Sequence, residues 1–147
     1  METVKIYIET SFRGPCVRNG KYAAALVTTG REQDYELIIS GEEEESTFNR
    51  CTLLAAAKSL HRMNRRCHVI LYTDNLYVKN MIEQGNPEKW KRAEWKKAAG
   101  TEVQNKELWK LFLEEAEKQD IEVEYCRCSE YTGKLQAVMH GEESEYV

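Results

Sequence analysis

Hydrophobic and polar side chains alternate at the start of segment 4–14, where Val4, Ile6 and Ile8 alternate with Lys5, Tyr7 and Glu9. Segments 21–29 and 33–40 are two further predicted strands. A period of two residues is typical of strands that bury one face. Only a few residues around Gly30 separate the second segment from the third, and the link between the first two is also short. We therefore predict a meander of three antiparallel strands.

The pattern changes after the third predicted strand. Apolar residues then recur at helical spacing, and either Ser46 or Thr47 can cap that helix. The apolar run 68–73 is typical of a strand covered on both faces. Further along, the pattern predicts a helix at 75–85 that ends at Gly85 before Pro87, a helix at 104–119, a strand at 121–128 and a short helix in the tail from about Thr132.

The predicted order of elements is βββ–α–β–α–α–β–α. Short links make the first three strands antiparallel, whereas helical crossovers make the later strands parallel to their predecessors. The expected fold class is therefore α/β, with a five-stranded mixed sheet flanked by helices. A chain of 147 residues fits one domain, which we place at 1–147.

The overall composition is that of an ordinary soluble globular protein, with 41% hydrophobic and 10% aromatic residues. The start of the chain has no basic region followed by an apolar run, so we expect no signal peptide. No apolar stretch is long enough to span a bilayer. We expect a cytoplasmic protein without a membrane partner.

The cysteines favour a reducing compartment over a disulfide framework. They are five, an odd number, and lack C-x-x-C spacing. Cys126 and Cys128 would share one face of a strand, but no second close pair of ligands accompanies them, so a zinc site is disfavoured. We expect most of these thiols to be buried as small hydrophobic groups.

Charge is unevenly distributed along the chain. The formal net charge is −4, with an acidic run at 42–45 and an acidic tail at 142–145. Between Gly85 and Gly100 the sign reverses, and the arginines of 62–66 form a second basic cluster. Local sign matters more than the total for docking, so these basic segments are candidate binding surfaces.

Two predicted strands end in carboxylates. Glu9 closes the first strand, and Asp74 directly follows the fourth. If these strands are neighbours, both side chains meet at one edge of the sheet, where α/β sites commonly form. Oxygen ligands without a nearby histidine favour Mg²⁺ or Mn²⁺ over zinc. Two alternatives remain open: Asp74 as a helix N-cap and Glu9 as a solvated strand end.

Five stretches, in order, resemble the type 1 ribonuclease H (RNase HI) family: IYIETS, TFNRCTLLAAAKSL, VILYTDNLYV, KWKRAEWKK and VQNKELWKLF. The family has Asp-Gly-Ser at the end of its first strand, then T-x-N-R-x-E-L, T-D-S-x-Y-V and a Lys/Trp-rich handle before V-K-N-x-x-L-W. The match runs from about Val4 to Tyr125. It implies an RNase H-like fold. It also implies cleavage of the RNA strand of RNA–DNA hybrids by two divalent metal ions held by four carboxylates.

The resemblance assigns the metal ligands residue by residue. Glu9 stands where the family has its first aspartate, and Asp74 matches the aspartate after the fourth strand. Thr52 falls where the family has its helical glutamate, and Ser129 lies near the position of a mobile catalytic histidine. The fourth carboxylate has no counterpart. Glu9 and Asp74 are thus the implied catalytic and metal-binding residues, and Thr52 marks a missing ligand.

Half of the implied ligand set is absent, which limits the expected chemistry. Two dications need more negative charge than two carboxylates supply, so we expect at most one weakly bound Mg²⁺ or Mn²⁺. RNA cleavage, the ancestral activity, should be weak or lost. The alternative is that Glu130, Glu142 or Glu143 folds back to complete the site.

The resemblance also implies a surface for an RNA–DNA hybrid or a related duplex. Its polar contacts would come from the T-x-N-R motif, in which Phe48 replaces a common asparagine, and from the segment KWKRAEWKK at 89–97, which we call the handle. The handle could instead be a solvated helical face with its tryptophans packed inward or bracing the loop. A catalytically inactive binding protein, or a module that meets a protein partner, stays open as an alternative. The implied nucleic-acid contacts are Thr47, Asn49, Arg50, Lys89, Trp90, Lys91, Arg92, Trp95, Lys96 and Lys97.

Overall fold

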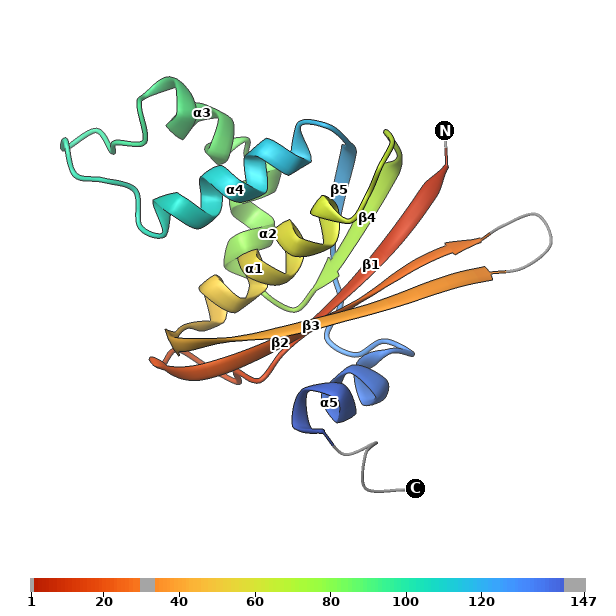
Figure 1. Cartoon of the computed structure of the whole chain (residues 1–147). Coiled ribbons are helices and arrows are strands. Elements are labelled where there is room, and N and C mark those ends of the chain that lie inside the picture. The colour runs from red at the N-terminus through yellow and green to blue at the C-terminus, as the bar shows by residue number, and fades with distance from the viewer. Residues whose placement is uncertain (1, 30–33, 142–147) are drawn as a thin grey trace.

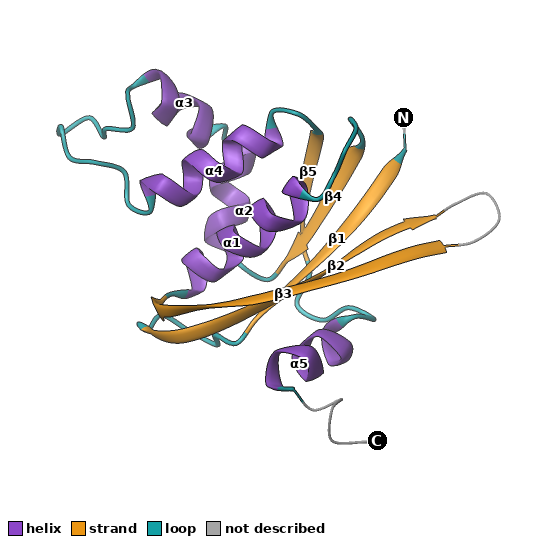
Figure 2. Ribbon diagram, in the orientation of Figure 1, coloured by secondary structure: helices purple, strands orange, loops and turns teal. Residues whose placement is uncertain are grey.

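A twisted sheet of five strands forms the centre of the molecule, shown in Figures 1 and 2. The computed structural model describes residues 2–29 and 34–141. The strand order is β3-β2-β1-β4-β5; β2 is antiparallel to β1 and β3, whereas β4 is parallel to β1 and β5. The predicted mixed sheet is confirmed. Its strands are β1 (Thr3–Thr10), β2 (Arg18–Thr29), β3 (Asp34–Ser46), β4 (His68–Thr73) and β5 (Asp120–Tyr125).

Helices cover both faces of this sheet. Helix α1 packs on β1, β2 and β3, and α4 packs on α1. Helix α5 lies on the opposite face, as Figure 1 shows, against the same three strands. The described helices are α1 (Phe48–His61), α2 (Leu76–Glu83), α3 (Asn86–Arg92), α4 (Lys106–Ala116) and α5 (Thr132–His140). None of the helices in the described part of the chain is long and apolar enough to cross a membrane.

The alternation of the first strand places its apolar residues in the core. Val4, Ile6 and Ile8 are buried in the layer beneath α1. The expectation that β4 is covered on both faces is only half met: Val69 and Leu71 are buried, whereas the opposite face of the strand is half-buried. The reason is that α5 packs on β1, β2 and β3 and leaves the other face of β4 only partly covered.

Several predicted boundaries differ from the structure; β2, for example, begins at Arg18 and α4 covers only Lys106–Ala116. Gly85, with φ +70°, follows α2 as expected, but Pro87 lies in the first turn of an additional helix, α3, because proline fits that position. Strand β3 continues through the acidic run to Ser46 because the ladder with β2 extends there. Strand β5 ends at Tyr125, so the stretch 126–128 is a loop.

The cysteines are more exposed than expected. Cys51 and Cys67 are buried, and Cys126 is intermediate. Cys16 and Cys128 are exposed, so the expectation of burial is wrong for these two. Both lie in irregular segments outside the strands, where no layer of helices covers them.

Candidate functional site

The two strand-end carboxylates lie beside each other where the neighbouring inner strands β1 and β4 end. The parallel pairing of β1 with β4 aligns Tyr7 with Tyr72, and Glu9 and Asp74 each follow that pair by two residues. Both side chains are half-buried. The strands are neighbours, as the hypothesis of a shared site requires.

Neutral donors from α5 hold the Glu9 carboxylate. Thr132 donates its hydroxyl to Oε2 at 2.8 Å, and Gln136 donates from Nε2 to Oε1 at 3.0 Å. Burial raises the pKa of Glu9 and the nearby Asp74 charge adds to that rise, while the two hydrogen bonds lower it. In the family that the sequence resembles, the last helix carries the fourth carboxylate. In this chain the last helix, α5, instead donates hydrogen bonds to Glu9 from a hydroxyl and an amide group.

Asp74 is not the cap of the helix that follows it. The N-cap of α2 is the next residue, Asn75, whose Oδ1 accepts from the backbone N–H of Val78 at 3.0 Å. Burial raises the pKa of Asp74, and the charge of Arg127 lowers it in part. The helix-cap interpretation of Asp74 is therefore wrong, and its carboxylate is not committed to α2.

The position of the missing helical carboxylate lies in a buried neutral network. Thr52 donates its hydroxyl to the carbonyl of Phe48 at 2.8 Å and accepts from Asn75 Nδ2 at 3.2 Å. The same Nδ2 donates to Asn49 Oδ1 at 2.9 Å. Asn75 thus connects α1 to the end of β4 directly beside Asp74. Sequence reasoning missed this residue, although an asparagine just before a helix is a signal for a cap.

The donor set fits one hard divalent cation better than two. Glu9 and Asp74 offer neighbouring carboxylate oxygens, which a hard cation prefers, and the hydrogen bonds to Glu9 come from neutral groups. Within residues 2–29 and 34–141, no group of three or more His, Cys, Asp or Glu side chains is arranged to hold a metal. Glu130 is exposed, whereas Glu142 and Glu143 lie outside the described residues. The second ion of a two-metal centre therefore does not fit the described side chains.

The arginine of the T-x-N-R motif is engaged inside the protein. Arg50 forms a two-pronged ion pair with Glu43, at 2.9 and 3.0 Å, and also donates to Glu107 at 3.1 Å and to Asn105 at 3.2 Å. These bonds, first of all those to Glu43, raise the pKa of Arg50. Thr47 caps α1 by accepting from the Arg50 backbone N–H at 3.2 Å. Arg50 therefore joins β3, α1 and the start of α4.

The two tryptophans of the handle pack inward. Trp90 meets Trp109 edge-on, with ring centroids 5.3 Å apart, and packs against the core. Trp95 is buried, and the Lys110 ammonium lies 5.8 Å from the centre of its ring. The two rings therefore pack inward and brace the handle, which was one of the two interpretations of these tryptophans. The cationic side chains of the handle stay on the surface. The exposed cations are Lys89, Lys91, Arg92, Lys96 and Lys97, of which Lys91 pairs with Glu117.

We expect Asp74→Asn to stabilise the metal-free protein at neutral pH. The pKa of Asp74 is raised above its ordinary value of 3.8 in the folded state, so the unfolded chain loses this proton first. The free energy of unfolding therefore falls as pH rises from the unfolded pKa of 3.8 to the higher folded pKa, and it stays lower at every pH above the folded pKa. The variant should unfold a few degrees higher than the natural chain at pH 7, with no gain at pH 3. Thermal unfolding in a chelator measures this; the exposed Asp120→Asn serves as the control, and an equal gain at both pH values would contradict the prediction.

The five-stranded sheet, the helix across it and the paired strand-end carboxylates together define an RNase H-like fold. The RNase H family model matches residues 1–134, and the chain belongs to the RNase H family. It is 40% identical to a ribonuclease H of Caldanaerobacter subterraneus over 116 residues, which cover 77% of this chain and 71% of that one. A ribonuclease H of Xanthomonas euvesicatoria is 39% identical over 70% of this chain and 67% of its own.

Solved structures share the fold at low sequence identity. A type 1 RNase H with the type 2 active-site motif superposes with a TM-score of 0.77 at 16% identity, over 99% of this chain and 74% of that one. The RNase H domain of a foamy virus superposes with a TM-score of 0.62 at 15% identity, over 95% of this chain and 90% of the viral domain.

Proposed function

We propose that this chain binds RNA–DNA hybrids or related duplexes, and that its metal-dependent cleavage of the RNA strand is weak or lost. Family membership supports the general activity. The observation that supports the weakness is that the hydrogen-bonding side chains beside the two carboxylates are neutral: Thr132 and Gln136 donate to Glu9, and the Thr52–Asn75 pair lies beside Asp74.

The chemistry of phosphodiester cleavage explains the expected weakness. A divalent ion, Mg²⁺ or Mn²⁺, would supply Lewis-acid activation of the phosphate when bound, and Glu9 and Asp74 would hold it. Of the family's four ligands, one position holds the neutral Thr52 and the fourth carboxylate has no counterpart. If each loss costs about 3 kcal/mol of transition-state stabilisation, the rate falls by about two orders of magnitude apiece, or roughly four together.

A hollow beside the start of α1 supports nucleic-acid binding. It has a volume of about 550 Å³ and is lined by the loop 14–17, by Thr47, Phe48 and Asn49, and by the segment 104–105. Side-chain hydroxyl and amide groups at a helix N-terminus suit a phosphodiester backbone. Arg50 donates a hydrogen bond to Asn105, which lines this hollow. We therefore assign Arg50 the role of positioning Asn105 rather than of contacting nucleic acid directly.

A cleavage assay tests the proposal. We expect slow, Mn²⁺-dependent loss of a labelled RNA–DNA hybrid at high protein concentration, or none, and no cleavage by Asp74→Asn. Turnover at the rate of a complete four-carboxylate enzyme would refute the claim of weakness. The binding claim is tested separately, by titrating an uncleavable hybrid at low salt in a chelator; absence of binding there would refute it.

Lys96→Gln and Lys97→Gln should each weaken hybrid binding and lower its salt dependence. Both lysines are exposed on the handle. A lysine that neutralises one phosphate contributes about 0.9 to the slope of log K against log salt, so the slope should fall by about that amount per substitution. Fluorescence anisotropy at four salt concentrations measures it. Lys5→Gln, at the far end of β1, is the control and should leave the slope unchanged; an equal loss there would mean that general charge, not the handle, sets the affinity.

A further inference from the structure

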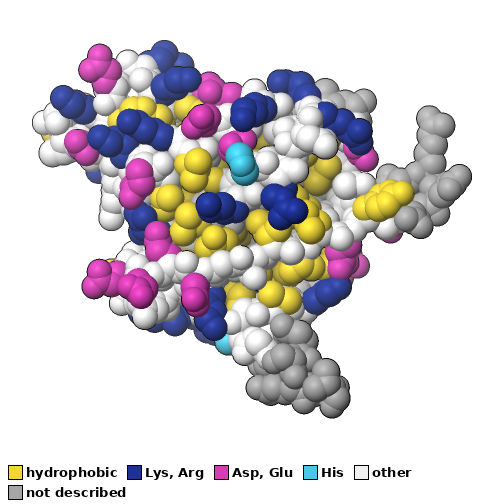
Figure 3. Space-filling model, viewed as in Figure 1, with side chains coloured by type: hydrophobic (Ala, Val, Ile, Leu, Met, Phe, Trp, Pro, Cys, Tyr) yellow, Lys and Arg dark blue, Asp and Glu magenta, His cyan; other side chains and the backbone are white. Residues whose placement is uncertain are grey.

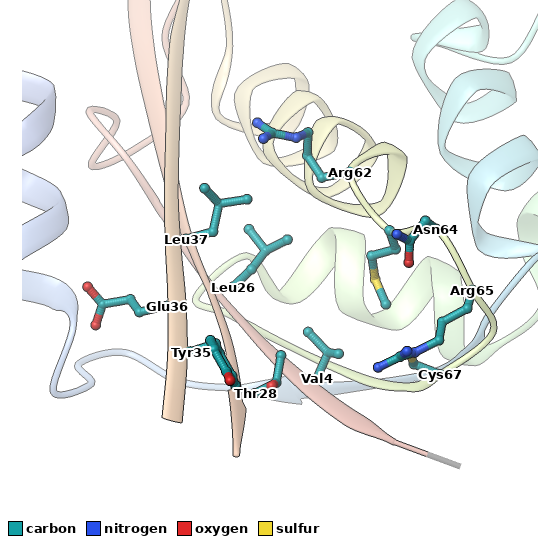
Figure 4. A pocket seen from close by; sticks show the side chains of 11 residues that line it. Val4, Leu26, Thr28, Tyr35, Glu36, Leu37, Arg62, Asn64, Arg65 and Cys67 are labelled. Carbon is teal, nitrogen blue, oxygen red and sulfur yellow. The ribbon is translucent and has the colours of Figure 1, made fainter. Parts of the chain in front are cut away.

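Two adjoining hollows form a groove between the C-terminal half of α1 and strand β3, which we call the α1–β3 groove. One hollow, shown in Figure 4, has a volume of about 360 Å³, and the other of about 330 Å³. Arg62 lines both. The first hollow reaches Val4 at the start of β1, whereas Glu9 lies at the end of that strand. The first hollow is therefore at the opposite end of β1 from Glu9. The second hollow reaches Tyr22, which pairs with Thr10, but it lies on the face of the sheet that α1 covers, whereas Glu9 is bonded by α5 on the other face.

The floor of the α1–β3 groove is apolar and partly open to solvent. Leu26 and Val4 form its buried base, and β3 contributes Tyr35 and Leu37, which are 57% and 38% exposed. On this side of the molecule, Figure 3 shows hydrophobic side chains interspersed with Lys and Arg. Exposed apolar side chains gathered in a hollow with a polar rim are typical of interaction sites.

The rim of the groove carries uncompensated positive charge. The side chains of Lys58 and Arg62 are exposed, and neither side chain makes a hydrogen bond or ion pair with another residue of the described chain. The neighbouring carboxylates are already engaged: Arg65 bonds to Glu2. Likewise, Lys134 bonds to Glu36 and His61 to Glu115. In a protein of net charge −4, this end of the molecule is available to an acidic ligand.

We propose that the α1–β3 groove binds an acidic, extended segment of a partner protein that alternates carboxylates with bulky apolar side chains. The positive rim complements the carboxylates, and the floor accepts the apolar side chains. An extended segment is favoured because the groove has Tyr35 and Leu37 of β3 on one side and Lys58 and Arg62 at the end of α1 on the other, and an extended chain presents alternate side chains to opposite sides.

A peptide titration on the whole chain tests this site. The probe is a fluorescent eight-residue peptide of four Asp-Leu repeats, followed by anisotropy; four Asp-Ser repeats and four Lys-Leu repeats are the comparison peptides. We expect saturable binding of the Asp-Leu peptide only. Arg62→Glu should weaken it at least about tenfold, and Leu37→Ser by a similar factor. Arg66→Glu makes the same charge change at an exposed arginine outside the groove and should leave affinity within about twofold.

Each other outcome overturns the proposal. Equal binding of Asp-Ser repeats would define a general anion site, and equal binding of Lys-Leu repeats would define a nonspecific apolar surface. Equal losses in Arg62→Glu and Arg66→Glu would show that only long-range charge acts. If an RNA–DNA hybrid displaces the peptide and Arg62→Glu loses hybrid affinity in parallel, the groove belongs to the nucleic-acid surface. Circular dichroism of each variant confirms that affinity changes occur in folded protein.

Discussion

Thr52→Glu is expected to tighten Mn²⁺ binding by about ten- to a hundredfold and to raise hybrid cleavage by about two orders of magnitude. Thr52 is bonded to Asn75, directly next to Asp74, so a carboxylate placed there adds a third negative oxygen ligand to the edge that carries Glu9. The gain in rate follows if each ligand contributes about 3 kcal/mol to the transition state. Calorimetric titration with Mn²⁺ and single-turnover cleavage measure the two effects.

The same substitution should destabilise the metal-free protein. Thr52 is 1% exposed, and the change removes the hydroxyl that bonds to Phe48 and Asn75. A charge buried without a partner costs several kcal/mol, and we expect a loss of about 2–4 kcal/mol in the free energy of unfolding. Added Mn²⁺ should restore much of it. Thr52→Gln is the matched neutral control: it should lose stability without recovery by Mn²⁺, and equal Mn²⁺ affinities of the two variants would disprove the placement of Thr52.

The elements that could be predicted from sequence are those specified by local patterns. Alternation identified β1 because one face of that strand is buried, and the parallel pairing of β1 with β4 then brought Glu9 and Asp74 together. This pairing depends only on strand direction and order, which short links and helical crossovers determine. The placement of Glu9 and Asp74 next to each other was therefore predictable from the sequence.

The environment of the carboxylates was not predictable in the same way. Thr132 and Gln136 reach Glu9 from 123 and 127 residues away, and neither side chain belongs to a recognisable pattern. Arg50 was assigned to nucleic acid by its motif, but its charge is bonded to Glu43 and Glu107, which come from β3 and α4. Such pairings are decided by the tertiary fold, in which a half-buried arginine requires carboxylate partners.

The inward packing of the handle tryptophans leads to the second large expected effect. Trp109 on α4 is 1% exposed and meets the rings of Trp90 and Phe112 edge-on, with centroids 5.3 and 6.0 Å away. Edge-to-face aromatic contacts add to the free energy gained from burying these large rings. Trp90 comes from α3, so this contact fixes the base of the handle on α4.

Trp109→Ala is expected to lower the free energy of unfolding by about 3–5 kcal/mol, a large share of the 5–15 kcal/mol typical of a domain. Because α3 loses its support, hybrid binding through Lys96 and Lys97 should weaken too, although Trp109 is buried. Trp109→Phe keeps an aromatic ring and should lose less of both. Urea unfolding followed by circular dichroism gives the stability, and anisotropy in the folded range gives the affinity. Lys96→Gln should weaken binding at unchanged stability; full hybrid affinity in folded Trp109→Ala would show that the handle does not depend on α4.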